Sequence, residues 1–100
     1  MNTNQTTKPD EIIVYWNTTD RANEGWAYRV SHRSPTGPGT MAAGRIADKS
    51  FGLCHLEPDA KPSEQIEAVV TIAWHYGIDI DSGSVAYDPA NLSATWEAVA

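Results

Sequence analysis

The most regular hydrophobic pattern in the chain runs through KPSEQIEAVVTIAWHYGI, residues 61–78. Its apolar residues recur at the i, i+3, i+4, i+7 spacing of one helical face, and they are Ile66, Val69, Val70, Ala73 and Trp74. Pro62 suits the first turn, Gly77 supplies the left-handed residue that ends many helices, and Ile78 can fold back on the last turn. We predict a helix that buries this stripe against the strands that precede it.

Two segments before this helix have the composition and alternation of β-strands. Residues 11–16, EIIVYW, are rich in β-branched and aromatic types and place apolar side chains on both faces, which is typical of a central strand or of a sheet covered on both sides. Residues 26–32, WAYRVSH, alternate between apolar and polar positions, which predicts a half-buried strand. We expect this second strand to pair with the first.

The remaining segments predict shorter elements. Residues 41–47 and 51–56 have the pattern of two short strands, and residues 85–88 have that of another. Asp88 followed by Pro89 matches a helix start, so we predict a short C-terminal helix over about residues 89–99. That helix would place Leu92 and Trp96 on one side, with Trp96 as a core anchor more readily than an exposed contact residue.

A chain of 100 residues is the size of one domain. Residues 1–10 are polar and predict a flexible N-terminal tail, which leaves residues 11–100 as the folded unit. The order of elements predicts an α+β fold: an antiparallel three- to four-stranded sheet, one main helix packed on it, and the short C-terminal helix.

Charge is distributed unevenly along the chain. The formal net charge is −6. Residues 51–100 carry a charge of −7, with eight acids and one base, and residues 1–50 carry +1. A net acidic domain is a poor general binder of nucleic acid, whereas an acidic surface suits a basic partner. The acids expected to contact such a partner are Glu64, Glu67, Asp79 and Asp81; the alternative is a solvated acidic face that aids solubility.

Three arginines form a second candidate binding group. We expect Arg29, Arg33 and Arg45 near one another on the solvent side of the sheet. Interleaved with Tyr15 and Trp16, they would form an interaction patch of the residue types that dominate binding energy. The alternative is that these arginines are ordinary solvated side chains on a polar strand face.

Catalytic and metal-binding patterns are weak. Cys54 and His55 are adjacent, so in a strand they would point to opposite faces and could not form a nucleophile–base pair. The three histidines and Cys54 lack the spacing of a zinc site. The segment from Asp79 to Gly83 opens like a calcium loop, but its glycine is at position five and Ala90 stands where the loop needs glutamate. We predict no catalytic residues, no metal and no cofactor.

The compartment is predicted from cysteine usage and hydropathy. Cys54 is the one cysteine, so the chain cannot form an internal disulfide, which fits a reducing cytoplasm. The N-terminal residues lack the basic and apolar regions of a secretory signal, and no apolar run approaches the ~20 residues of a membrane span. We therefore expect a cytoplasmic protein with no membrane partner.

Four short motifs carry a resemblance to a known class of proteins. They are Gly25-Trp26, Ala43-Gly44-Arg45, Phe51-Gly52-Leu53, and the helix start with Pro62 and Glu64. This layout resembles the small phage-encoded anti-CRISPR proteins of type I-F. The resemblance implies a non-enzymatic inhibitor that binds CRISPR–Cas subunits of a type I surveillance complex in the host bacterial cell and blocks DNA binding or nuclease recruitment. From the charge, the acidic half would act as a DNA mimic.

The strand–strand–strand–helix order is also similar to HicB-like antitoxins and to double-stranded RNA-binding folds. An antitoxin of that kind commonly carries a separate DNA-binding segment, and none is recognisable in this sequence. An RNA binder of that fold needs basic residues at the helix start, where this chain has Lys61, Glu64 and Glu67. We expect a protein-binding inhibitor without direct nucleic-acid contact, monomeric or dimeric, with a HicB-like antitoxin or another small interaction module as the alternative.

Overall fold

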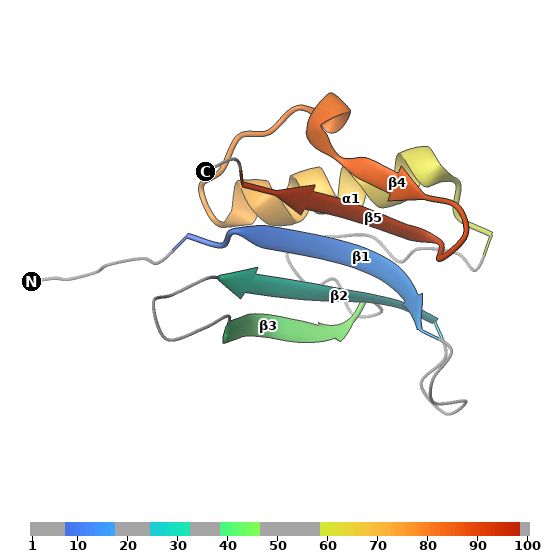
Figure 1. The fold of residues 1–100 in the computed structure, drawn as a ribbon, viewed down its shortest axis with the longest axis horizontal. Helices are drawn as coiled ribbons and strands as arrows, with labels where there is room; N and C mark the ends of the chain where they lie inside the picture. The colour runs from blue at the N-terminus through green and yellow to red at the C-terminus, as the bar shows by residue number, and fades with distance from the viewer. Residues whose placement is uncertain (1–7, 18–24, 33–38, 47–58, 99–100) are drawn as a thin grey trace, which may run out of the picture.

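The computed structural model describes residues 8–17, 25–32, 39–46 and 59–98. In the described part the elements follow one another as β1 (Glu11–Asn17), β2 (Gly25–His32), β3 (Gly39–Arg45), α1 (Pro62–His75), the 3-10 turn η3 (Ser82–Ser84), β4 (Ala86–Asp88) and β5 (Ser93–Glu97). Figure 1 shows one layer of strands with α1 behind it. The fold is α+β, as the sequence predicted.

The five strands form one antiparallel sheet in the order β3-β2-β1-β5-β4. β1 lies in the middle, where it pairs with β2 from Glu11↔Ser31 to Asn17↔Gly25 and with β5 from Glu11↔Glu97 to Tyr15↔Ser93. The predicted central position of this strand and its pairing with the next strand are therefore confirmed. Burial alternates along β1 because Ile12 and Val14 face the helix and are fully buried, whereas Ile13 and Tyr15 on the other face are half-buried.

The predicted C-terminal helix is wrong, and the sheet has five strands instead of three or four. Residues 93–97 form β5, which lies between β1 and β4. In a strand, Ala94 and Trp96 point to the same face, and both are buried there. Trp96 is thus a core residue, as expected, but it reaches the core from a strand.

The expected helix start at Asp88 caps a turn instead. Its carboxylate accepts hydrogen bonds from the Ala90 amide at 3.0 Å and from the Asn91 side-chain amide at 2.7 Å. Leu92 then adopts a left-handed conformation with φ of 49°, which helps to return the chain as β5. An acid side chain that caps a turn has the same local sequence as one that caps a helix, and this explains the error.

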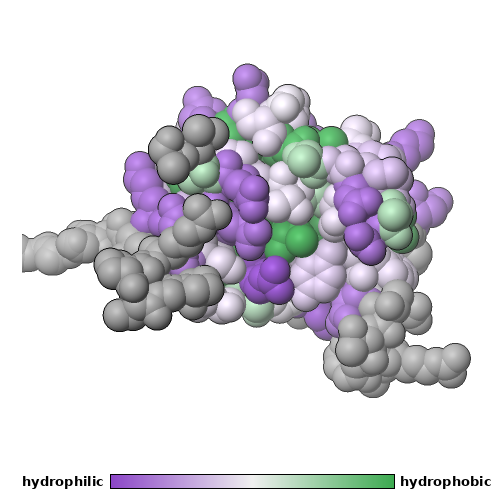
Figure 2. All heavy atoms as spheres, viewed as in Figure 1, coloured by the Kyte–Doolittle hydropathy of each residue, from purple (hydrophilic) through white to green (hydrophobic). Residues whose placement is uncertain are grey.

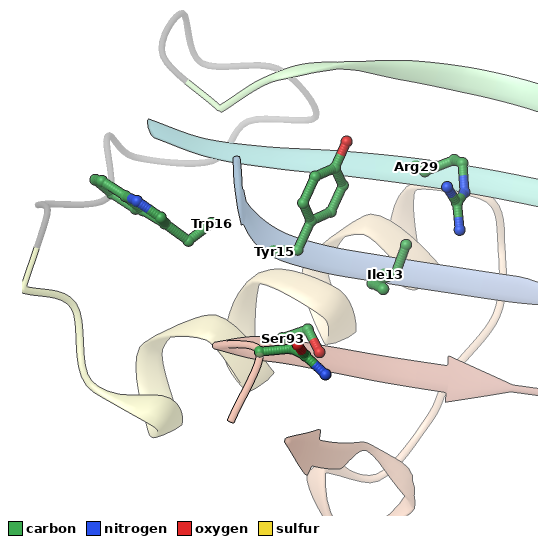
Figure 3. A pocket seen from close by; sticks show the side chains of 6 residues that line it. Ile13, Tyr15, Trp16, Arg29 and Ser93 are labelled. Atoms are coloured by element: carbon green, nitrogen blue, oxygen red, sulfur yellow. The ribbon is translucent and has the colours of Figure 1, made fainter. Parts of the chain in front are cut away.

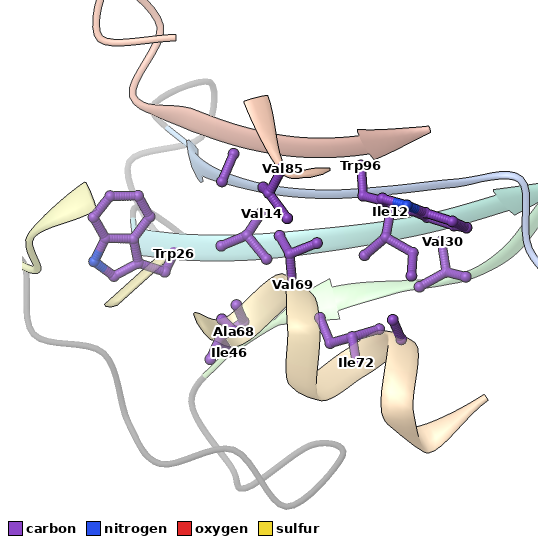
Figure 4. Close-up of a cluster of buried hydrophobic side chains, with 12 residues drawn as sticks. Ile12, Val14, Trp26, Val30, Ile46, Ala68, Val69, Ile72, Val85 and Trp96 are labelled. Carbon is purple, nitrogen blue, oxygen red and sulfur yellow. The ribbon is translucent and has the colours of Figure 1, made fainter. Parts of the chain in front are cut away.

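The core lies between α1 and the helix-facing side of the sheet. Figure 4 shows Val69 and Ile72 pointing from α1 toward Val14 and Ile12 of β1. Trp26 and Ile46 close one end of this cluster, and Trp96 and Val85 belong to the same core. Small residues such as Ala68 and Ala73 bring the helix backbone close to the sheet.

The helix is rotated relative to the stripe that the sequence predicted. Its buried residues are Gln65, Ala68, Val69, Ile72 and Ala73, whereas Ile66 and Val70 are half-buried at the border. Trp74, predicted to be buried, is 69% exposed. Gln65 takes a core position because its side-chain amide donates to the Leu92 carbonyl at 3.2 Å, a partner 27 residues away that helical periodicity does not reveal.

Both ends of α1 follow the sequence prediction. Pro62 opens the helix, and the Lys61 amide donates to the Glu64 carboxylate at 2.8 Å. At the other end, Gly77 has φ of 78°, its amide donates to the Trp74 carbonyl at 2.9 Å, and Ile78 donates to the Ala73 carbonyl at 2.9 Å. This pair of bonds is the Schellman arrangement.

Other sequence predictions fall partly outside the described residues. The strand predicted at 41–47 is β3, and that predicted at 85–88 is β4. The strand predicted at 51–56 lies outside the described residues, as do residues 1–7 of the predicted tail. Pro9 is buried, and the backbone of Asp10 bonds to Ser31 and to Ala98 at 2.8 Å each, so these two residues of the predicted tail pack on the folded domain.

Candidate functional site

The helix side of the molecule carries a marked excess of acids. Between residues 59 and 84 the chain has five acids against one lysine, a net charge of −4, and all six side chains are exposed: Asp59, Lys61, Glu64, Glu67, Asp79 and Asp81. The four acids predicted to contact a partner are among them. An excess of exposed carboxylates over ammonium groups produces a field that attracts cations.

These acids lie near the two ends of the helix and not in a single cluster. Glu64 and Glu67 lie on the first two turns of α1, whereas Asp79 and Asp81 follow its other end. At ~1.5 Å rise per residue, the length of helix after Glu64 is roughly 16 Å. Glu64 differs from the other three because its carboxylate also caps the helix.

Trp74 is an exposed aromatic residue on the same side of the helix. It stands seven residues, or about two turns, after Glu67, so the two side chains share one helical face. Half-buried Val70 lies one turn before Trp74 on that face. Sequence reasoning assigned Trp74 to the core, because at the border of an amphipathic stripe a large apolar residue is read as buried.

The opposite face of the sheet has no helix over it among the described elements, and Figure 1 looks onto it. The strand pairing puts Arg45, Ala27, Tyr15 and Ser93 in one row across this face. Arg29 lies in the next row, beside Ile13. Figure 2 shows a small hydrophobic spot in the middle of this face, bordered by hydrophilic residues.

The predicted arginine patch is brought together in part. Arg29 and Arg45 are exposed on this open face, on neighbouring strands, whereas Arg33 lies outside the described residues. Tyr15 shares the face, as predicted. Trp16 pairs with Trp26 in a helix-facing row, and their rings meet edge to face with centroids 5.0 Å apart.

A hollow of about 420 Å³ lies on this open face (Figure 3). It is lined by Ile13, Tyr15, Trp16, Arg29, Asn91 and Ser93. The Arg29 guanidinium lies 4.0 Å from the Glu11 carboxylate, with the two side chains 48% and 32% exposed. An ion pair this long and this solvated contributes little, so the guanidinium keeps most of its capacity for another acid.

Among the titratable groups of the described residues, the pKa of one, Tyr76, is clearly shifted. Burial raises the pKa of the Tyr76 phenol above its ordinary value of 10.0, and the nearby phenol of Tyr28 raises it further. In the part of the chain that the structure describes, no three His, Cys, Asp or Glu side chains gather closely enough to hold a metal ion. Cys54 and His55 lie outside the described residues.

Comparison with known proteins adds no relative: no family model, no curated protein and no solved structure matches the chain. Among the described residues, no helix is long and apolar enough to cross a membrane. The candidate surfaces therefore rest on their own geometry: the acidic helix side with Trp74, and the open sheet face with its arginines.

Proposed function

We propose that the protein is a non-enzymatic inhibitor that binds another protein through its acidic helix side. The proposed target is an arginine- and lysine-bearing surface of a type I CRISPR–Cas surveillance complex in the host bacterial cytoplasm, where occupancy would block DNA binding or nuclease recruitment. The observation that carries the proposal is the exposed Trp74 on the same helical face as Glu67, within a side of net charge −4.

The chemistry of this side suits a nucleic-acid-binding partner surface. A channel that binds DNA presents guanidinium and ammonium groups, which pair with carboxylates as they do with phosphates. An exposed indole adds a flat face over which a partner guanidinium can stack. The acids supply the rate and orientation of encounter, and Trp74 supplies a desolvated contact at the centre.

The first test is affinity capture of the tagged full chain from cells that express a type I complex, read by mass spectrometry. We expect Cas subunits in stable proportion with the parent and with Trp74→Phe, and at least about tenfold less with Trp74→Ala. Because Trp74 is 69% exposed, Trp74→Ala should unfold within a few degrees of the parent. Equal recovery with all three chains would exclude Trp74 as the contact.

The acids need a separate test that respects the helix cap. One combined variant reverses the charge of this side; it carries Glu67→Lys, Asp79→Lys, Asp81→Lys and Glu64→Gln. The Glu64→Gln change keeps a side-chain oxygen that can accept from the Lys61 amide. This variant should lose inhibition of DNA binding by the complex. Glu97→Lys, an exposed reversal on β5, is the matched control and should inhibit like the parent. Full inhibition by the combined variant would reject the acidic-mimic mechanism.

The same capture distinguishes the alternative function. The described chain has the strand–strand–strand–helix order of HicB-like antitoxins, and this order supports an antitoxin as the alternative function. Recovery of a small ribonuclease-like protein in place of Cas subunits would assign the chain to that class.

A further inference from the structure

A second binding surface lies at the end of the sheet where β1 stops and the β4–β5 turn begins. The hollow of about 420 Å³ on the open face is continued by a second one of about 260 Å³, lined by Trp16, Ala90, Asn91 and Leu92. The two hollows share Trp16 and Asn91 and are therefore neighbours; the pair is called here the turn groove. Figure 3 shows Tyr15 and Arg29 standing along its first part.

The turn side of this groove is held rigidly. The Leu92 carbonyl accepts from the Trp16 amide at 3.3 Å and from the Gln65 side-chain amide at 3.2 Å, so it ties β1 and α1 to the turn. Asp88 holds Ala90 and Asn91 from the other side. These bonds maintain a left-handed leucine, a conformation that branched side chains rarely adopt, and leave its apolar side chain 44% exposed.

The residues that line the turn groove carry one positive charge, on Arg29, and two acids, Glu11 and Asp88, lie at its border. Arg29 is the one charged residue among those that line the two hollows in the described chain. The nearest acid of the turn, Asp88, already accepts from Ala90 and from Asn91. The side chains of Tyr15, Asn91 and Ser93 add hydrogen-bonding groups around an apolar floor that includes Ile13.

We propose that the turn groove binds an extended acidic segment of a partner protein. A carboxylate of that segment pairs with Arg29, and a neighbouring apolar side chain packs on Trp16 and Leu92. Tryptophan, tyrosine and arginine converge here, and these three types dominate the binding energy of protein interfaces. A polyanionic nucleic acid fits less well: the described chain carries a net charge of −5, with nine acids against four bases, and a long phosphate backbone meets more of that charge than a short segment whose carboxylate pairs with Arg29.

This inference is independent of the acidic helix side. The turn groove contains none of the residues 62–81, and its charge has the opposite sign. The protein would thus hold a basic surface with its helix side and an acidic segment with its sheet. Failure at one surface leaves the other unaffected, since their test variants do not overlap.

The test is a titration of the ¹⁵N-labelled full chain with defined peptides, followed by amide and indole chemical shifts. The probe is an acetylated, amidated octapeptide that alternates leucine and glutamate; the controls are the leucine–lysine octapeptide and an eight-residue thymidine oligonucleotide. We expect the leucine–glutamate peptide alone to shift Tyr15, Arg29, Ser93 and the Trp16 indole, without shifts along α1. Equal or stronger shifts of these signals by either control would overturn the proposal.

Two variants make the assignment specific. Arg29→Glu should weaken peptide binding at least tenfold, whereas Arg45→Glu, an exposed reversal on the same face outside the groove, should change it less than twofold. Leu92→Asn keeps a residue that tolerates the left-handed conformation while it removes the apolar contact, and should also weaken binding. Equal effects of Arg29→Glu and Arg45→Glu would show attraction by general charge and refute a defined groove.

Discussion

At the scale of single residues, Gly77 ends the main helix in a conformation that other residues adopt at a cost. Its φ is 78°, and a Cβ there would meet nothing within 4 Å, so a substitution adds backbone strain without a clash. Gly77→Ala should therefore lower the free energy of unfolding by about 1–2 kcal/mol, measured by urea denaturation. Gly83→Ala is the matched control, since a Cβ there also meets nothing, and should change it by less than ~0.5 kcal/mol.

Tyr76 makes stability depend on alkaline pH. Its folded pKa is raised by burial and by Tyr28, whereas the unfolded phenol titrates near 10.0. The unfolded chain therefore loses its proton first, so stability is full below pH 10 and falls as pH rises through the folded pKa. Tyr76→Phe should flatten the fall in denaturation midpoint between about pH 9 and 11. The same slope in both chains would contradict this assignment.

At the scale of elements, Gln65 joins α1 to the β4–β5 turn but leaves one polar atom unsatisfied. The side chain is fully buried, its amide nitrogen bonds to the Leu92 carbonyl, and its Oε1 has no partner in the described part of the chain. Gln65→Met keeps the volume, and the Leu92 carbonyl keeps Trp16, so stability should stay equal or rise by up to ~1 kcal/mol. Gln65→Glu should lose more than ~2 kcal/mol, because it buries an unpaired charge. Thermal unfolding at neutral pH measures both changes.

At the scale of the whole molecule, the negative charge is concentrated between residues 59 and 84. Residues 59–84 carry a net charge of −4, whereas the described residues from 8 to 46 carry +1, with three bases and two acids. Capture of a basic partner by the helix side should therefore weaken more than tenfold between about 50 and 500 mM salt, since screening shortens the reach of exposed charges. The unfolding temperature of the free chain, measured in the same buffers, should move by only a few degrees.

The sequence by itself determined the elements whose signals are local. The α1 helix has a 3.6-residue period, a proline at its start and a glycine after its end. β1 is apolar on both faces, as suits a central strand, and β2 alternates between apolar and polar positions. The exposed acids and the arginines of the open face were also named from composition and alternation. Each of these signals acts within a few residues, where steric and hydrogen-bonding preferences decide the outcome.

The tertiary structure alone decided the last strand, the rotation of the helix and the turn groove. Leu92 and Trp96 are spaced as on a helix, while Ala94 and Trp96 are spaced as on a strand, so the local pattern is ambiguous. The free edge of β1 resolves it, because pairing there satisfies the backbone of both strands and buries Trp96. In the same way, burial of Gln65, Val69 and Ile72 against the sheet leaves Trp74 outward. Local periodicity does not reveal such long-range contacts, because they stabilise the fold only when segments distant in the sequence meet.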